Sequence, residues 1–478
     1  MKTVLVNPPH TLEERYGKLA GAGSNLPSLG LLSLAAVLRK EGFPVQVVDA
    51  PAENIGYSEC LERIFSFEAR LVGLSAVTPS IHKAAKLADE IKARDPGITI
   101  VVGGAHSTAV PEETLRRFSA FDMAIVGEGE ETLVELTRAL KSHSPLAEIP
   151  GLVFRDQNGL TATAPRETIK DLDSLPFPAW DLLPRFPHAY HPAAFKTKRL
   201  PATYLLTSRG CPHQCIFCDT SVFSRQFRAF GAPYIIEMIR LLRRDYGIRE
   251  ISFEDDTFII FKKRLRELCE TLIREKIDIS WTCNGRVNAV EPETLRLMKR
   301  AGCWQIAYGI ESGEQEILDF AKKQIKLEQA AQAVRWTHEA GIFSKGFFIL
   351  GFPKETEETL RKTIRFALSI PLDDITVCQM IPFPGSEMYK IGPQYGKIET
   401  DWEKMNLLDV VFVPHGLTED LLRKYQNKFL RDFYLRPRIF FSYFKRLLDS
   451  PGNILGIFQG FAAFIKTVFG SSKRTNMP

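Results

Sequence analysis

Residues 209–219 read RGCPHQCIFCD and follow directly on the apolar run ATYLLTS of residues 202–208. Cys211, Cys215 and Cys218 therefore lie within eight residues of chain. Soft thiolates bind iron–sulfur clusters, and three cysteines on one short loop can reach three irons of a cubane cluster. The fourth iron then has no protein ligand and stays open to another molecule.

Zinc binding and a purely structural role both fit this cysteine loop less well. Zinc usually takes four Cys or His ligands, and although His213 lies inside the loop, a second CxxC pair is missing. Unrelated core cysteines fit poorly with a loop that also holds Arg209 directly after a strand. Three cysteines elsewhere fall on predicted strands and are expected to be core thiols: Cys283, Cys303 and Cys378.

A series of strands and helices continues after the cysteine loop. The apolar segments are EISFEDD, ISWTCNGR, CWQIAYGIES, FSKGFFILGFP and ITVCQMIPFPGS, with helical patterns between them. Together with the strand before the loop, these segments predict a partial (β/α)6 barrel over residues 201–395. Its active site should lie at the carboxyl ends of the strands.

A separate α/β pattern occupies residues 1–140. Short apolar runs such as KTVLVNPP, PVQVVDA, ITIVVGGAH and MAIVGEGE alternate with helical patterns. This alternation predicts a doubly wound, flavodoxin-like parallel sheet with its ligand beyond the strand carboxyl ends. Taken one at a time, the glycines at these strand ends are also explained by tight turns between strand and helix. The candidate contacts at those ends are Asn7, Pro8, Ser75, Thr78, Gly103, Gly104, His106, Gly127 and Glu128.

Two further regions complete the chain. Residues 141–200 are rich in proline and read as a linker, whereas residues 396–478 read as a helical extension that is basic and aromatic. Basic residues among Phe and Tyr predict peripheral contact with an anionic membrane. A helical cap on the barrel is an equally good interpretation of that extension.

Overall composition excludes several classes of protein. The 478 residues are 45% hydrophobic and 25% charged, close to globular averages, and exceed what one core usually serves. A net charge of +5 is too small to indicate a nucleic-acid-binding protein. The first apolar run is short and is broken by Pro8 and Pro9, so no signal peptide is predicted and we expect a cytoplasmic location.

RGCPHQCIFCD in this position resembles the radical S-adenosylmethionine (SAM) superfamily. The resemblance implies a 4Fe-4S cluster on Cys211, Cys215 and Cys218 whose open iron binds the amino and carboxylate groups of SAM. A reductant such as flavodoxin or ferredoxin would then allow cleavage of SAM to a 5'-deoxyadenosyl radical. The implied SAM contacts are Phe217 near the adenine, Glu254, Asp255 and Asp256 at the amino group, Arg286, Gly309, Glu311 and Ser312 along the ribose and methionine, and Gly351 and Phe352 near the adenine.

Residues 1–135 are similar to the cobalamin-binding domain of the radical SAM class that includes the anaerobic magnesium-protoporphyrin cyclase and cobalamin-dependent methyltransferases. The resemblance implies that the strand-end residues named above contact cobalamin. Other cobalamin domains carry a D-x-H-x-x-G loop whose histidine binds cobalt, but this chain has Asn7-Pro8-Pro9-His10-Thr11 there. We therefore expect cobalt to lack that imidazole ligand.

The two resemblances together imply a cobalamin-dependent radical SAM enzyme. The leading hypothesis is methylation of an unactivated carbon of a small molecule through the 5'-deoxyadenosyl radical and methylcobalamin. The alternatives are an oxidative cyclase or ring-rearranging enzyme with the same cofactors, and a non-catalytic cobalamin-binding protein. A methylthiotransferase is disfavoured because residues 1–150 contain only Cys60. The basic, aromatic extension points to a lipid or isoprenoid substrate.

Overall fold

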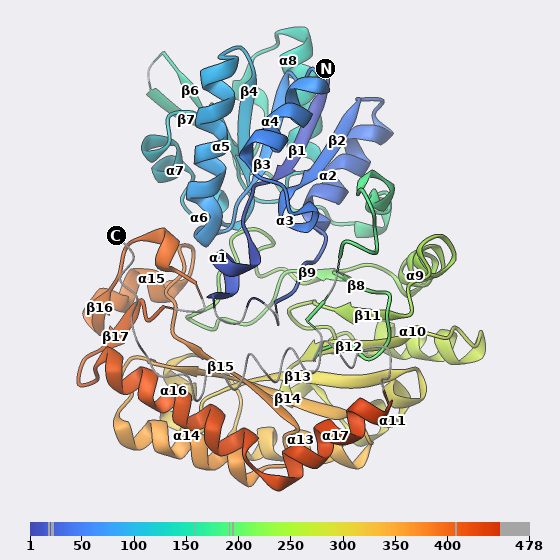
Figure 1. Cartoon of the computed structure of the whole chain (residues 1–478), viewed down its shortest axis with the longest axis vertical. Helices are drawn as coiled ribbons and strands as arrows, with labels where there is room; N and C mark the ends of the chain where they lie inside the picture. The colour runs from blue at the N-terminus through green and yellow to red at the C-terminus, as the bar shows by residue number, and fades with distance from the viewer. Residues whose placement is uncertain are drawn as a thin grey trace.

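The computed structural model describes residues 1–17, 20, 23–157, 159–190, 192–193, 196–406 and 409–449. The chain forms two α/β bodies stacked along its long axis, the N-terminal sheet above and a curled sheet below (Figure 1). Residues 450–478 of the predicted helical extension lie outside the described residues. In the described part, no helix is both long and apolar enough to cross a bilayer.

The upper body contains a seven-stranded sheet of order β2-β1-β3-β4-β5-β6-β7. The first five strands are parallel to one another, as predicted. The sixth strand pairs antiparallel with the fifth, and the seventh pairs antiparallel with the sixth. The strands are β1 (Thr3–Asn7), β2 (Val45–Asp49), β3 (Leu71–Ser75), β4 (Thr99–Gly103), β5 (Met123–Ile125), β6 (Leu152–Asp156) and β7 (Gly159–Ala162).

Strands β6 and β7 come from the segment expected to be an irregular linker. Asp156 pairs with Gly159 across this hairpin, and Gly159 has φ of +120°. A glycine after a short apolar run is a turn signal, which the prolines of the surrounding segment obscure. The segment therefore extends the first sheet instead of only joining two domains.

Helices bury both faces of this sheet, and successive strand side chains point to opposite faces. On β1, Leu5 packs against α2 and α8, whereas Val4 and Val6 pack against α4, α5 and α7. The helices of this body are α1 (Leu12–Tyr16), α2 (Leu29–Lys40), α3 (Ala50–Glu53), α4 (Tyr57–Ser66), α5 (Ile81–Arg94), α6 (Ala105–Ala109), α7 (Pro111–Arg117) and α8 (Glu130–Ser142).

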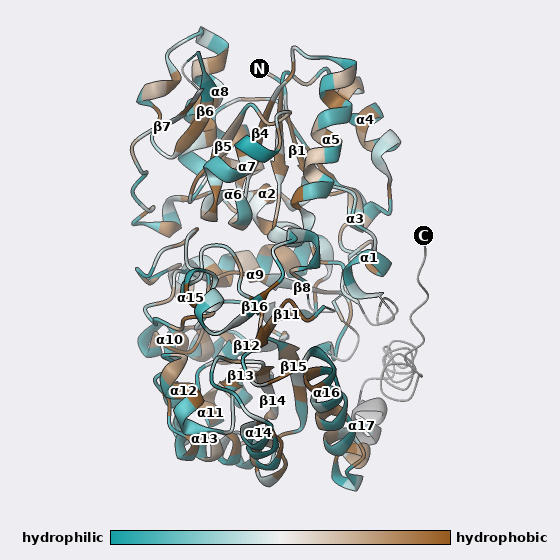
Figure 2. Cartoon of the chain, turned by 90° about the vertical axis from the view of Figure 1, so that its left-hand side faces the viewer, coloured by the Kyte–Doolittle hydropathy of each residue, from teal (hydrophilic) through white to brown (hydrophobic). Residues whose placement is uncertain are grey.

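The lower body is a six-stranded parallel sheet of order β15-β14-β13-β12-β11-β8, as predicted for a partial barrel. Its apolar strands lie inside and polar helix faces lie outside (Figure 2). The strands are β8 (Ala202–Leu205), β11 (Glu250–Phe253), β12 (Ser280–Gly285), β13 (Cys303–Glu311), β14 (Phe343–Leu350) and β15 (Asp374–Gln379). The helices are α9 (Ala232–Tyr246), α10 (Lys262–Arg274), α11 (Pro292–Arg300), α12 (Gln315–Phe320), α13 (Leu327–Glu339) and α14 (Glu357–Ser369).

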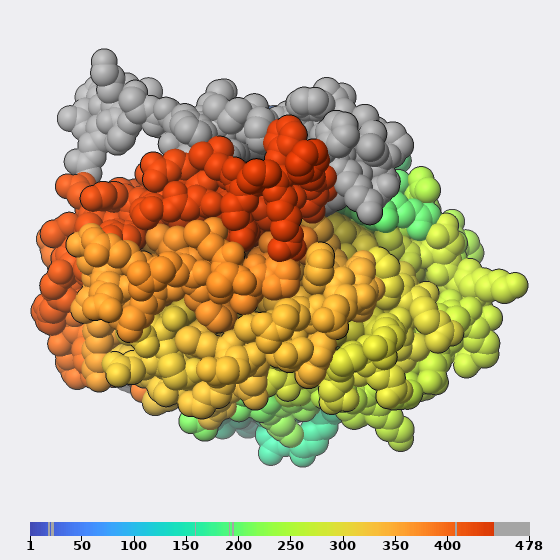
Figure 3. Space-filling view, turned by 90° about the horizontal axis from the view of Figure 1, so that it is seen from below, coloured from blue at the N-terminus to red at the C-terminus, as the bar shows by residue number. Residues whose placement is uncertain are grey.

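The described part of the C-terminal extension caps the barrel. It follows α15 (Glu387–Ile391) and contains β16 (Gly396–Ile398), β17 (Phe412–Pro414), α16 (Glu419–Tyr434) and α17 (Pro437–Asp449). The side chains of Leu422, Phe429 and Phe433 on α16 are buried, and Gln426 Nε2 donates to the Val377 carbonyl of β15 at 2.9 Å. Helix α16 thus covers the edge strand of the half-barrel, and it lies along the barrel helices in Figure 3.

Candidate active site and cofactor-binding sites

The three cysteines lie on a loop at the carboxyl end of β8. A two-stranded ribbon, β9 (Ser208–Arg209) and β10 (Arg228–Ala229), joins the two ends of this loop. Ile216 anchors the middle of the loop, because its N–H donates to the Ala321 carbonyl at 3.1 Å and its carbonyl accepts from Met388 N–H at 2.8 Å. The backbone therefore fixes the cysteines from three sides.

The surroundings of Cys215 suit a cluster ligand. The hydrogen bond with Cys218 lowers the pKa of Cys215 to about 6, and the positive charges of Lys323 and Arg286 act in the same direction. Arg286 Nη1 lies 3.9 Å from Cys215 Sγ. Thiolates are the form that binds iron, so the observed donor set fits a cluster. Within the described residues, no three His, Cys, Asp or Glu side chains are placed to hold one metal ion.

A buried ion pair lies beside the cysteine loop. Lys323 Nζ is 2.6 Å from Glu311 Oε1, and both side chains are 8% exposed. A Cβ at Gly309 would overlap both charged groups, so glycine leaves room for the pair. The sequence singled out Gly309, Glu311 and Arg286 but missed Lys323, which follows a short helix and belongs to no strand-end motif.

Two phenylalanines meet near the last cysteine. The rings of Phe217 and Phe352 lie edge to face with 5.7 Å between centroids, and Gly351 precedes Phe352 with φ of +90°. Glu355 fixes this turn by accepting from Gly351 N–H at 2.5 Å and Phe352 N–H at 3.1 Å. Ser312 is buried and contacts Thr363 Oγ1 at 3.2 Å, so its hydroxyl has an internal partner.

The three acidic residues after β11 have different surroundings. Asp255 is fully buried and accepts hydrogen bonds from Thr207 and Ser208. Glu254 is partly buried and accepts from Ser252 Oγ at 2.7 Å and Asn284 Nδ2 at 3.1 Å. Asp256 is exposed, and its charge raises the pKa of Cys211, although burial raises that pKa more. Asp256 is therefore best placed to reach a cationic ligand group.

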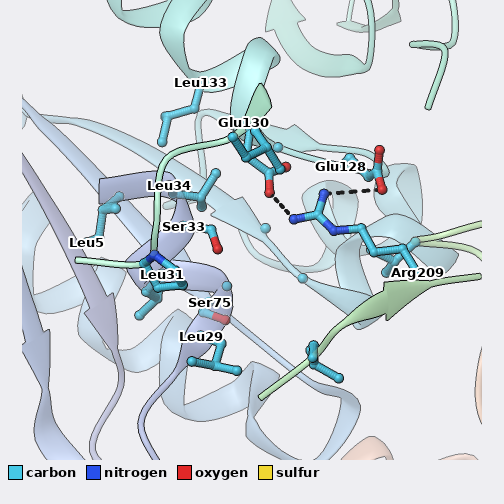
Figure 4. A pocket seen from close by; sticks show the side chains of 18 of the residues that line it. Leu5, Leu29, Leu31, Ser33, Leu34, Ser75, Glu128, Glu130, Leu133 and Arg209 are labelled. Atoms are coloured by element: carbon cyan, nitrogen blue, oxygen red, sulfur yellow. Dashed lines mark hydrogen bonds and ion pairs between the residues drawn. The ribbon is translucent and has the colours of Figure 1, made fainter. Parts of the chain in front are cut away.

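A cavity of about 180 Å³ lies beyond the carboxyl ends of β1, β3, β4 and β5 (Figure 4). Its walls come from the sheet and helices α2 and α8 on one side and from the barrel on the other. Apolar lining residues include Leu5, Leu29, Leu31, Leu34, Val101, Ile125, Leu133, Leu205, Phe223 and Phe230. An apolar cavity at the end of a parallel sheet fits the flat aromatic base of a cobalamin nucleotide tail.

Five of the nine predicted cobalamin contacts line this cavity: Ser75, Gly103, Gly104, Gly127 and Glu128. A Cβ at Gly103 would meet no atom within 4 Å, so this glycine borders free space. Gly104 has φ of +106°, and a Cβ there would lie 2.7 Å from the Ala76 carbonyl oxygen. Gly103 therefore leaves the cavity open, whereas Gly104 is required by the turn.

The other four predicted contacts lie outside the cavity lining. Asn7 Nδ2 donates to Asp49 Oδ1 at 2.8 Å, and Pro8 is buried. His106 is fully buried; its Nδ1 lies 3.2 Å from Thr78 Oγ1, and its ring packs edge to face on Trp402 with 4.3 Å between centroids. Trp402 arrives from the segment after the barrel, a distant contact that the sequence around His106 does not reveal.

Known protein families match both bodies of the chain. A B12 binding domain matches residues 18–137, and the radical SAM superfamily matches residues 205–367. An uncharacterized methyltransferase of Pyrococcus horikoshii is 34% identical over 95% of this chain and 96% of its own length. The anaerobic magnesium-protoporphyrin IX monomethyl ester cyclase of Cereibacter sphaeroides is 28% identical over 92% of this chain and 71% of its own length.

Solved structures share the fold. The radical SAM methyltransferase TsrM from Kitasatospora setae, with cobalamin and a 4Fe-4S cluster bound, has a TM-score of 0.68 at 18% identity over 82% of this chain and 78% of its own. The cobalamin-dependent radical enzyme OxsB, with aqua-cobalamin and SAM bound, has a TM-score of 0.74 at 18% identity over 96% of this chain and 72% of its own. The chain belongs to the radical SAM enzymes that carry an N-terminal B12-binding domain.

Proposed function

We propose that this enzyme is a cobalamin-dependent radical SAM methyltransferase that methylates an unactivated carbon of a small molecule. The observation that carries the proposal is the pairing of a three-cysteine loop with an apolar cavity at the facing edge of the upper sheet. The methyltransferase name of the Pyrococcus horikoshii relative supports the reaction type. When bound, the cluster and SAM supply hydrogen abstraction and cobalamin supplies methyl transfer.

In this proposal the residues around the cysteine loop bind and orient SAM. Arg286 donates to the Lys323 carbonyl and faces Cys215, so it fixes the strand exit of β12 against the loop. Asp256 offers a carboxylate to the SAM ammonium, because a carboxylate and an ammonium form a strong charge-assisted hydrogen bond. Phe217 and Phe352 offer aromatic surface to the adenine and exclude water from it.

The cavity residues hold the cobalamin tail in the same proposal. Leu29, Leu34 and Leu133 supply apolar surface from α2 and α8, and Gly103 leaves the space that an aromatic base needs. Phe223 and Phe230 close the cavity from the barrel side. Because residues of the sheet and of the barrel line this cavity, a group held there would lie between the two bodies.

Product analysis tests the reaction type. The full-length protein is reconstituted anaerobically with iron, sulfide and cobalamin, then given SAM and either flavodoxin or a chemical reductant. We expect both 5'-deoxyadenosine and S-adenosylhomocysteine once the substrate is present. The reaction consumes one SAM to form the radical and a second SAM as the methyl donor. The Cys215→Ala variant is the control for cluster-dependent cleavage. Release of 5'-deoxyadenosine without S-adenosylhomocysteine would exclude methyl transfer.

Oxidative cyclisation is the second candidate reaction. It is favoured by the similarity to the Cereibacter sphaeroides cyclase, which extends over 92% of this chain. The same product analysis separates the two reactions, because cyclisation needs no methyl donor. A non-catalytic cobalamin carrier predicts neither product.

We also propose that the substrate is a lipid or isoprenoid taken from an anionic membrane. Leu435, which follows α16, and Phe440 and Phe441 on α17 are 60%, 63% and 67% exposed. Arg438 on α17 is a basic side chain that is 43% exposed and lies 3.5 Å from Asp373 Oδ1. Apolar rings beside basic side chains favour the interface of an anionic bilayer.

Vesicle co-sedimentation tests this membrane contact. Truncation before α16 would remove the buried side chains that cover β15, so a surface variant is the better choice. We expect Phe440→Ser/Phe441→Ser protein to bind vesicles of phosphatidylglycerol and phosphatidylcholine roughly tenfold more weakly than the original chain. Phe261→Ser, at another exposed phenylalanine that is 46% exposed, is the control. Equal binding by all three proteins would refute membrane contact.

A further inference from the structure

Four buried charged residues join the upper body to the cysteine loop. Glu128 and Glu130 lie where the loop after β5 enters α8, Arg209 lies two residues before Cys211, and Arg228 lies on β10. Their exposed fractions are 5%, 6%, 8% and 7% in that order. We call these four residues the interdomain ion group.

The contacts within this group cross between the bodies. Arg209 Nη2 lies 2.5 Å from Glu130 Oε1, and Arg209 Nη1 lies 3.2 Å from Glu128 Oε1 (Figure 4). Arg228 Nη1 lies 2.9 Å from Glu128 Oε1. Two carboxylates thus balance two guanidinium groups away from solvent. Displacement of one member would leave an uncompensated buried charge, so the group resists separation.

One end of the interdomain ion group belongs to the cofactor cavity. Glu128, Glu130 and Arg209 all line it, and the sequence predicted Glu128 to be a direct cobalamin contact. Besides its two arginine partners, the Glu128 carboxylate accepts from the Ile169 N–H at 2.8 Å. Glu128 Oε2 is therefore hydrogen-bonded by the protein, whereas Oε1 has ion-pair contacts with both arginines but no hydrogen bond from the described residues. The carboxylate is held from the protein side, which favours a supporting position in the cavity wall.

The other end belongs to the cysteine loop. In the β9–β10 ribbon that joins the loop ends, the backbone of Arg209 lies opposite the backbone of Arg228. Gly210, between Arg209 and Cys211, has φ of +81°, and the Gln226 and Phe223 carbonyl oxygens fill the space beside its Cα. The connection from Arg209 to the first cysteine is therefore short and closely packed. Movement of Arg209 would move Cys211.

We infer that the interdomain ion group couples occupation of the cavity to the position of the cysteine loop, with Arg209 as the positioning residue. The inference rests on the proposed function, because it takes cobalamin as the occupant of the cavity. A ligand that fixes the wall at Glu128 and Glu130 also fixes Arg209 and hence the loop. By linkage, an assembled cluster must strengthen cobalamin binding by the same factor as cobalamin strengthens cluster retention.

Equilibrium dialysis of hydroxocobalamin against the full-length protein measures this coupling. The dissociation constant is determined for cluster-reconstituted and iron-free protein, and the ratio of the two is compared between variants. We expect iron-free original protein to bind roughly fivefold or more weakly than reconstituted protein. In Arg209→Gln the ratio should fall to about one, since both contacts across the bodies are cut. In Glu130→Gln it should fall part of the way, because Glu128 still lies 3.2 Å from Arg209. Arg209→Lys, which keeps the charge, should retain part of the coupling.

Arg166→Gln is the matched control. Arg166 lies 3.0 Å from Glu131 Oε2 and also pairs with Glu135, both on α8, and its side chain is 10% exposed. This variant loses an ion pair on the same helix without touching the cysteine loop, so its ratio should equal that of the original protein. The EPR signal of the reduced cluster gives a second readout, which should respond to cobalamin in the original and Arg166→Gln proteins but not in Arg209→Gln.

The outcomes separate the coupling from the proposed function. A ratio of about one in the original protein would overturn the coupling, as would a ratio that stays at its original value in both Glu130→Gln and Arg209→Gln. Failure of the original protein to bind cobalamin at all would overturn the proposed function and the coupling with it. If Arg209→Gln does not fold, Glu130→Gln decides, because Glu128 still faces Arg209 in that variant.

Discussion

The hydroxyl of Thr207 donates to the Asp255 carboxylate at 2.5 Å inside the protein. Thr207 precedes the cysteine loop, and Asp255 follows the neighbouring strand β11. Arg264 lies 3.7 Å from the same carboxylate and donates to the Thr207 carbonyl at 2.6 Å. These contacts hold the start of the cysteine loop against the barrel.

Asp255→Asn should destabilise the protein by about 3 kcal/mol. The substitution leaves the Arg264 charge uncompensated, and it places an amide NH2, itself a donor, against the hydrogen-bond donors of Thr207 and Ser208. We expect a lower urea midpoint and less iron per chain after reconstitution. Asp256→Asn is the adjacent control: its stability should change by less than about 0.5 kcal/mol, while SAM affinity falls roughly tenfold. Similar effects of both substitutions would contradict this division of roles.

Cys215→Ala should lower iron per chain roughly tenfold, because two thiolates hold a cubane cluster poorly. Cys283→Ala should keep its iron and lose about 1 kcal/mol of stability, since Cys283 is a buried barrel thiol. Iron and sulfide analysis combined with thermal unfolding measures both effects. Loss of iron in Cys283→Ala would show that the ligand set is different.

Gly103→Leu should fill the cavity and abolish cobalamin binding while the protein still folds. The reason is that a side chain at Gly103 enters free space and needs no left-handed backbone. Gly56→Leu places the same side chain in free space at the start of α4, outside the cavity. Equilibrium dialysis measures cobalamin binding by the two variants, and circular dichroism measures their folding. Normal cobalamin binding by Gly103→Leu would place the cofactor elsewhere.

His106 should make the protein less stable in mild acid. Burial lowers the pKa of His106 from 6.5 to about 4, and the charges of His82 and Arg117 act in the same direction. Between those two values the unfolded chain binds a proton that the folded chain does not, so stability falls as pH decreases through this window. The total loss is up to about 3 kcal/mol by proton linkage.

Urea unfolding at pH 7 and pH 5 measures this effect. The decrease between the two pH values should be smaller in His106→Gln than in the original protein. His188→Gln, at an exposed histidine, should behave like the original protein. If all three proteins lose equal stability, His106 is not the titrating group.

Short sequence patterns are enough to predict the local chemistry of this protein. Three cysteines at short spacing and glycines at strand exits are patterns of neighbouring residues, so they predicted the cluster loop, the parallel strands and the edge at which ligands lie. The 3.6-residue and two-residue periods likewise fixed which faces of the helices and strands are buried. The family comparisons agree with this fold and with the cofactors implied by it.

Packing between distant segments sets which partners the individual polar side chains have. Glu128 meets Arg209, His106 meets Trp402, and Lys323 meets Glu311. The first two contacts join residues far apart in sequence, and in all three the partner depends on how the strands and loops pack. A buried charge must find a partner wherever packing provides one, and no local pattern records which partner that is.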